Sequence, residues 1–300
     1  SALSFSRPDV RIVLSTEHIF YIIEVLSNMV FCFMNGVFLD GDQATLPVSD
    51  LALQRGVAVF DTVRSYDGRP FALKAHLERL SNSARLARIA EPLSAEEIGD
   101  IVREGLSRIE GDGLAKIFLT GGDVEEFGSF PSPRFLALFS PVAPIPEEFF
   151  TKGIALSLLH EERQLFRIKS INYMNAYRNH LPGTFEALHC VDGEITESAT
   201  SSFFGVAKDN LITAPDHRVL RGITREILID LARKEGYNVE YRCLTLDELP
   251  DLTEAFITGS VKEVTPVTRI GDTIIGGGAP GAVTKRMYEL FKESVPNHLG

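Results

Sequence analysis

The chain has 300 residues, of which 44% are hydrophobic and 24% are charged, and its formal net charge is −11. This balance is ordinary for a globular protein, and the length suits one large domain or, better, two domains with separate cores. The negative net charge argues against a nucleic-acid partner, because the phosphates would be repelled by the surface.

The first thirty residues, 1–30, are expected to form a structured N-terminal extension. An apolar run, "IFYIIEVLSNMVFCFM", covers residues 19–34 but is shorter than the roughly 20 residues that a membrane span needs. Glu24 and Asn28 interrupt it, and no small-residue cleavage site of a signal peptide follows it. We therefore expect no membrane partner.

A small α+β domain is predicted over residues 31–139. The stretch 31–50 carries Asn-Gly and Asp-Gly pairs between apolar runs, which indicates hairpins, and residues 57–74 repeat this pattern around another Asp-Gly pair. Apolar residues then recur every three or four positions over 73–89, as in a helix. A second helix is predicted over about 94–109, because a serine and then acidic residues open it.

A linker is predicted at 140–150, "SPVAPIPEEFF", because its prolines continue neither a sheet nor a helix easily. The remaining residues, 151–300, are predicted to form a larger α+β domain. It contains an Asp-Gly hairpin in "EALHCVDGEITE" and helices over about 223–235 and 281–293. Antiparallel hairpins with separate helices indicate an α+β fold of two domains rather than a doubly wound parallel sheet.

The cysteines and histidines suggest neither a disulfide framework nor a metal site. The three cysteines, Cys32, Cys190 and Cys243, are an odd number without CxxC spacing, which is typical of a reducing compartment. The seven histidines show no close pair of metal-ligand type. We expect a cytoplasmic protein without a catalytic metal.

Two polar residues in the larger domain allow a structural or a chemical interpretation. Lys169, in "FRIKSINYMNAY", is either a surface cation or an amine held beside a carbonyl compound, ready to form a Schiff base. Glu197, in "GEITESATSSFF", is either a solvated loop carboxylate or the group that keeps a cofactor ring nitrogen protonated. The residues alone leave both alternatives open.

Three further motifs are suited to anions. In "RGITRE" a glycine opens a helix whose first N–H groups are free to bind a phosphate, although many helices start after glycine. "TGSVKEVTPV" offers a second turn of this kind, with Ser260 and exposed amides. Arg79, in "AHLERL", either extends to solvent or presents its guanidinium to a phosphate.

Taken in chain order, these motifs resemble the class IV aminotransferases, the fold-type IV pyridoxal-phosphate enzymes. This family includes branched-chain amino-acid aminotransferases, D-amino-acid aminotransferases and aminodeoxychorismate lyases. The resemblance covers Phe33 to Phe291 and rests on "NGVF", "VSD", "FDTVRSYDGRPFALKAHLERL", the segment of Lys169, "DGEITESATSSFF", "LRGITRE" and "GSVKEVTPV". It implies the two-domain fold of D-amino-acid aminotransferases, pyridoxal 5'-phosphate as cofactor, and a homodimer with active sites near the interface.

The resemblance also implies roles for single residues. Lys169 is the catalytic residue that forms the Schiff base with the cofactor and moves the substrate proton. Its pKa is expected to be lowered by burial or by a nearby cation such as Arg167. Glu197 faces the pyridine nitrogen. The cofactor phosphate is held by a set of side-chain and backbone groups from Arg79, Ile223, Thr224 and Ser260.

Departures from the family pattern bear on the substrate. Asp61 stands where the family usually has glutamate, and Ser202 where it usually has asparagine. Gly121 replaces the arginine with which D-amino-acid members hold the substrate carboxylate, and acidic Glu125 and Glu126 follow it. The carboxylate site of the D-amino-acid enzymes is therefore expected to be absent.

We therefore favour an aminotransferase of the branched-chain type, which transfers an amino group from an amino acid to a 2-oxo acid. Its side-chain pocket is expected to include Phe60, Phe118, Met174 and Val261. Two alternatives remain: a 4-amino-4-deoxychorismate lyase, which shares the fold and cofactor contacts, and a pyridoxal-phosphate-binding protein with little catalysis.

Overall fold

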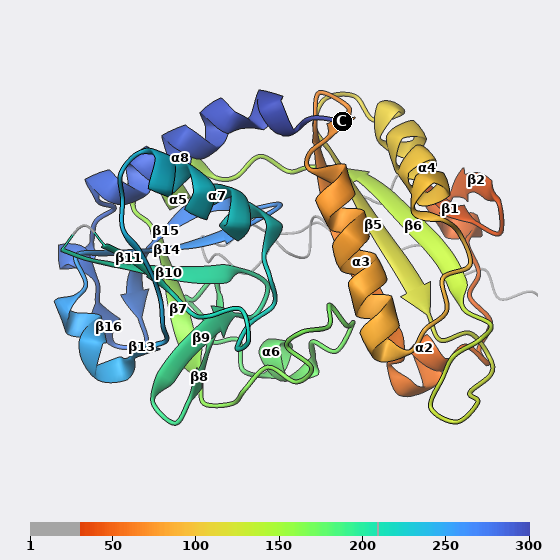
Figure 1. Cartoon of the computed structure of the whole chain (residues 1–300), viewed down its shortest axis with the longest axis horizontal. Helices are drawn as coiled ribbons and strands as arrows, with labels where there is room; N and C mark the ends of the chain where they lie inside the picture. Colours follow the sequence, from red (N-terminus) through yellow and green to blue (C-terminus); the bar gives the residue numbers. More distant parts are fainter. Residues whose placement is uncertain (1–30, 209) are drawn as a thin grey trace, which may run out of the picture.

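The computed structural model describes residues 31–208 and 210–300, and the prediction for residues 1–30 lies outside this part of the chain. The described residues form two β-sheets, each covered by helices, and short helix α6 (Met174–Arg178) lies between the two halves (Figure 1). Within these described ranges no helix is long and apolar enough to cross a membrane.

The first sheet is antiparallel and has the order β2-β1-β6-β5-β3-β4. Asn35-Gly36 and Asp67-Gly68 form its hairpin turns, as predicted, because both residues of each pair adopt positive φ angles. The Asp-Gly pair at 40 and 41 was expected to open another hairpin, and this was wrong: it leads into a 3₁₀ turn. The elements of this half are β1 (Phe31–Met34), β2 (Val37–Asp40), η2 (Gly41–Gln43), α2 (Leu51–Arg55), β3 (Ala58–Tyr66), β4 (Arg69–Pro70), α3 (Leu73–Ala87), α4 (Ala95–Ser107), β5 (Gly113–Thr120) and β6 (Arg134–Pro141).

Helices α3 and α4 lie where the apolar periodicity placed them and cover one face of this sheet (Figure 1). Leu80 and Ala84 of α3 and Val102 and Leu106 of α4 pack against the strands in one core. Ser94 caps α4 and forms a capping box with Glu97, which explains why the helix begins at Ala95.

The second sheet is mixed and has the order β12-β11-β10-β14-β15-β7-β8-β9-β13, with β16 beside β15. One of its faces carries α7 and α8, and the other carries a second core, so this half has layers on both sides of the sheet. Its elements are α5 (Glu147–Thr151), β7 (Ile154–Leu159), α6, β8 (Glu186–Val191), β9 (Glu194–Ser198), β10 (Ser202–Ala207), β11 (Asn210–Thr213), α7 (Ile223–Lys234), β12 (Val239–Tyr241), β13 (Leu244–Thr245), η3 (Leu246–Asp251), β14 (Glu254–Gly259), β15 (Glu263–Ile270), β16 (Thr273–Ile274), η4 (Gly276–Gly278), α8 (Ala282–Ser294) and η5 (Val295–His298).

The segment between β7 and β8 crosses from the second sheet to the first. The backbone N–H of Phe60 in β3 donates to the carbonyl of Lys169 at 2.9 Å, and Ser170 forms an antiparallel bridge with Val59. The N–H of Lys169 donates to the hydroxyl of Ser83 in α3 at 3.2 Å. Lys169 therefore belongs to the second half by sequence but is fixed to the first by its backbone.

Candidate active site

A cavity of about 490 Å³ lies between the two halves of the molecule and is large enough for a cofactor. The first sheet contributes alternate residues of neighbouring strands, Phe60 and Thr62 from β3 and Lys116 and Phe118 from β5, which point to one face. The second half contributes Lys169, residues after β9, the start of α7 and the turn between β14 and β15.

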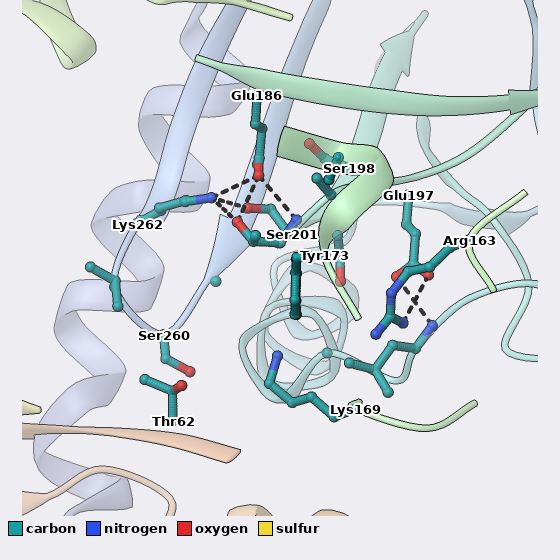
Figure 2. Close-up of a pocket in the computed structure, with 18 of the residues that line it drawn as sticks. Thr62, Arg163, Lys169, Tyr173, Glu186, Glu197, Ser198, Ser201, Ser260 and Lys262 are labelled. Atoms are coloured by element: carbon teal, nitrogen blue, oxygen red, sulfur yellow. Dashed lines mark hydrogen bonds and ion pairs between the residues drawn. The ribbon is translucent and has the colours of Figure 1, made fainter. Parts of the chain in front are cut away.

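The amine of Lys169 lies inside this cavity, 4.8 Å from the centre of the Phe60 ring (Figure 2). Burial lowers the pKa of Lys169 to about 7, and the cations Arg79 and Arg163 lower it further, whereas Asp61 and Glu197 oppose this. Arg167 was expected to contribute, and this was wrong, because its side chain is exposed to solvent. At neutral pH a large share of this amine is therefore uncharged and nucleophilic.

Glu197 is buried and faces Arg163 across the cavity wall (Figure 2). Its Oε1 is 3.4 Å from Nη1 of Arg163, and its Oε2 accepts the backbone N–H of Leu220 at 3.2 Å. Burial raises the pKa of Glu197, and the positive charge of Arg163 counteracts this rise. A protonated ring nitrogen is the kind of partner that would keep this carboxylate ionised.

The start of α7 and Arg79 form an anion site in the same cavity. Helix α7 begins at Ile223 after Gly222 and has no side-chain cap, so the N–H groups of its first turn are free for a ligand. Arg79 Nη1 donates to the carbonyl of Arg221 at 3.1 Å, which holds the guanidinium beside this helix start. A Cβ at Gly222 would lie 2.4 Å from the hydroxyl of Ser202, so the tight approach requires glycine.

These residues fit pyridoxal 5'-phosphate. The uncapped helix start beside an arginine suits a phosphate dianion, the buried carboxylate of Glu197 suits a pyridine N–H, and the amine of Lys169 suits an aldehyde. Thr224 and Ser260 line the same cavity. By contrast, the described residues contain no group of three or more metal-ligating side chains.

The residues predicted for the substrate pocket are only partly together. Phe60, Phe118 and Val261 line the cavity. Met174 does not: it opens α6 and is 74% exposed, because this short helix buries none of its residues. Gly121 and the acidic residues after it lie in a loop outside the cavity lining.

Comparison with known proteins agrees with this geometry. Residues 58–270 match the family described as amino-transferase class IV. The chain belongs to the class IV aminotransferases. It is 34% identical over 275 residues to a putative branched-chain-amino-acid aminotransferase of Methanocaldococcus jannaschii, covering 87% of this chain and 95% of the relative. It is 31% identical over 272 residues to a D-alanine aminotransferase of Bacillus licheniformis, covering 87% and 95%.

A solved structure of the same type also matches. A branched-chain amino acid aminotransferase from the source abbreviated T.th., solved with pyridoxamine 5'-phosphate, has a TM-score of 0.80 and 27% identity to this chain. The match covers 90% of this chain and 95% of that chain. The two-domain fold-type IV architecture expected from the sequence is thereby confirmed. The protein is a pyridoxal-phosphate-dependent aminotransferase.

Sequence reasoning missed several charged residues of this aminotransferase's cavity. Arg163, Lys116, Glu186 and Lys262 all line it. Lys262 and Glu186 pair with each other, and Arg163 pairs with Glu197, so their partners are distant in sequence. No local motif marks them; the strand alternation Phe60–Thr62 and Lys116–Phe118 is the one signal that could have placed Lys116 beside Phe118.

Proposed function

We propose that this aminotransferase transfers the amino group of a branched-chain type of amino acid to a 2-oxo acid, with Lys169 as the cofactor-bearing and proton-transferring residue. The observation that carries the proposal is the amine of Lys169, which lies in the cavity with a pKa of about 7. An amine with this pKa both attacks an aldehyde and accepts or returns a proton at neutral pH.

Bound pyridoxal 5'-phosphate supplies the electron sink that makes the α-proton of the amino substrate acidic. In our proposal, Arg79, the amides of Ile223 and Thr224, and Ser260 hold its phosphate. Glu197 accepts the pyridine N–H, and Arg163 keeps Glu197 ionised through its contact at 3.4 Å. Lys169 then takes the proton from the substrate Cα and returns it to the cofactor carbon.

Two features of the cavity support the substrate class. Phe60 and Phe118 stack at 5.5 Å and, with Val261, offer an apolar wall to a branched side chain. Lys116 lies on the same sheet face, and within the described residues no hydrogen bond or ion pair holds its amine. A free cation beside an apolar wall suits an acceptor with a second carboxylate, such as 2-oxoglutarate.

We further propose that the enzyme is a cytoplasmic homodimer with a small domain at 31–139, a linker at 140–150 and a larger domain at 151–300. Free Cys32, Cys190 and Cys243 support a reducing compartment. The separate cores of the two sheets support the division of the chain. Family membership supports the dimer, and sedimentation of the cofactor-loaded protein at several concentrations tests it.

A half-reaction tests the activity. Cofactor-loaded protein is mixed separately with L-leucine, D-alanine and aminodeoxychorismate, and the absorbance band of the lysine-bound cofactor is followed. We expect L-leucine to convert the cofactor to its amine form and 2-oxoglutarate to restore the band. Conversion by D-alanine alone would overturn the branched-chain assignment, and pyruvate release from aminodeoxychorismate without loss of the band would identify a lyase.

A further inference from the structure

A buried carboxylate lies directly behind Arg79. Asp61 of β3 is completely buried, and its Oδ2 accepts Arg79 Nε at 2.8 Å while its Oδ1 accepts Arg79 Nη2 at 2.8 Å. The same Oδ1 accepts the backbone N–H of Thr62 at 2.7 Å. Arg79 lines the cavity, whereas Asp61 lies outside the residues that form its wall. Asp61 therefore acts on the cavity through Arg79.

This carboxylate fixes the guanidinium in one orientation. A bidentate pair occupies the Nε and Nη2 side, and the carbonyl of Arg221 takes Nη1 at 3.1 Å. The donors that remain are on the outer edge of the guanidinium, next to the uncapped start of α7. An arginine held in this way loses little rotamer freedom when an anion binds.

A histidine in turn fixes the carboxylate. His76 Nδ1 is 2.7 Å from Asp61 Oδ1, and His76 is completely buried. Burial lowers the pKa of His76, and the neighbouring Arg79 holds the pKa of Asp61 well below its usual range despite burial. Neutral His76 therefore donates from Nδ1 to an ionised carboxylate. Its Nε2 has no partner within the described part of the chain.

The same carboxylate contributes to the charge around Lys169. Arg79 of α3 and Arg163 of the crossing segment disfavour the protonated amine, whereas Asp61 of β3 and Glu197 of β9 favour it. His76 is neutral, and burial raises the pKa of Tyr173, so neither adds a charge at neutral pH. Without Asp61, two cations would face Lys169 against one carboxylate.

We propose that Asp61 is a positioning residue of this aminotransferase, which locks Arg79 toward the cofactor phosphate and supplies a buried negative charge that faces Lys169, with His76 holding Asp61 in place. This inference rests on the proposed function, because it assumes that the cofactor binds at Lys169 and Arg79. It assigns roles to two residues that do not touch the cavity themselves.

The test compares Asp61→Asn with Asp50→Asn. Asp50 is also completely buried in the first half, where it accepts Arg134 Nη1 at 2.8 Å and the hydroxyl of Thr120 at 2.8 Å, but it does not line the cavity. Apoprotein is mixed with pyridoxal 5'-phosphate over a range of pH, and the rate of covalent loading is measured. We expect the midpoint of this profile to fall by about one pH unit in Asp61→Asn and to stay unchanged in Asp50→Asn.

A second pair of variants tests His76 even where Asp61→Asn folds poorly. His76→Leu removes the donor to Asp61, and we expect it to weaken cofactor binding about tenfold, whereas His76→Asn can place an amide N–H near the position of Nδ1 and restore it. Equal affinities of the two variants, or equal midpoints for the wild type and Asp61→Asn, would overturn the inference. A wild type that forms no covalent adduct would instead overturn the proposed function.

Discussion

Lys262 and Glu186, 76 positions apart in the sequence, form an ion pair inside the cavity wall, with Nζ 2.9 Å from Oε2 (Figure 2). The lysine amine also contacts the hydroxyls of Ser201, at 3.0 Å, and Thr200. Lys262 thereby ties the turn after β14 to the turn after β9, which carry Ser260 and Glu197 respectively. The side chains of Lys262 and Glu186 are only 11% and 4% exposed, so neither charge has water as an alternative partner.

We expect Lys262→Met to destabilise the protein by about 3–5 kcal/mol, because it leaves the carboxylate of Glu186 buried and unpaired. The double variant Lys262→Met/Glu186→Leu should lose less, since no isolated charge remains. Urea unfolding of the apoprotein measures both. A single variant as stable as the double would show that the pair is not coupled.

Cofactor loading should depend on pH through Lys169. Its pKa of about 7 lies below the ordinary lysine value, so the uncharged amine increases as the pH rises through this value. We expect the loading rate to rise about tenfold per pH unit below pH 7 and to level off above it. Stopped-flow absorbance measures the rate, and Lys169→Ala should give no covalent adduct at any pH. A flat profile across roughly pH 6 to 8 would contradict the value.

Arg163→Gln should impair turnover more than cofactor occupancy. The variant removes the cation that counteracts the raised pKa of Glu197 and the contacts of Arg163 with the carbonyls of Phe166 and Ile168. We expect kcat to fall about tenfold or more, the scale of losing an orienting partner.

Arg218→Gln is the matched control for Arg163→Gln. Arg218 pairs with Glu194 of the same strand as Glu197, at 2.7 Å, and lies outside the cavity lining. Its loss should leave kcat unchanged, because this more exposed ion pair contributes little. A similar fall in both variants would show that the strand, rather than Glu197, responds.

Lys116→Gln should discriminate between amino acceptors. Loss of the unpaired cation is expected to raise KM for 2-oxoglutarate about tenfold, the scale of one charge-assisted hydrogen bond. KM for 4-methyl-2-oxopentanoate, which has a single carboxylate, should change little. Steady-state kinetics with both acceptors measures this, and an equal change for both would remove Lys116 from acceptor recognition.

The sequence predicted those parts of the site that lie in short motifs. Arg79 was recognisable from its helical spacing, and Ile223 from the glycine before its helix, and the structure brings both into one cavity with Lys169 and Glu197. Arg163 could not be assigned, because its partner Glu197 lies 34 residues away and no spacing rule connects them.

The fold shows the same limit. The hairpins at Asn35-Gly36 and Asp67-Gly68 follow from turn chemistry, which is local. The parallel pairing of β15 with β7 joins strands that begin at Glu263 and Ile154, and nothing in either strand specifies that neighbour. Met174 was misplaced for a related reason: which way a five-residue helix faces depends on the segments around it.

The cavity wall is shared by two hydrophobic cores, and this makes any ligand that contacts both sides a structural member of the interface between them. Its binding free energy is added to the cohesion of the two halves, by the same linkage that lets a ligand raise a melting temperature. Loosening either core, at Leu80 beneath the first sheet or Phe256 beneath the second, must then lower the ligand's affinity. Cofactor retention in this enzyme is therefore a gauge of the integrity of both halves at once.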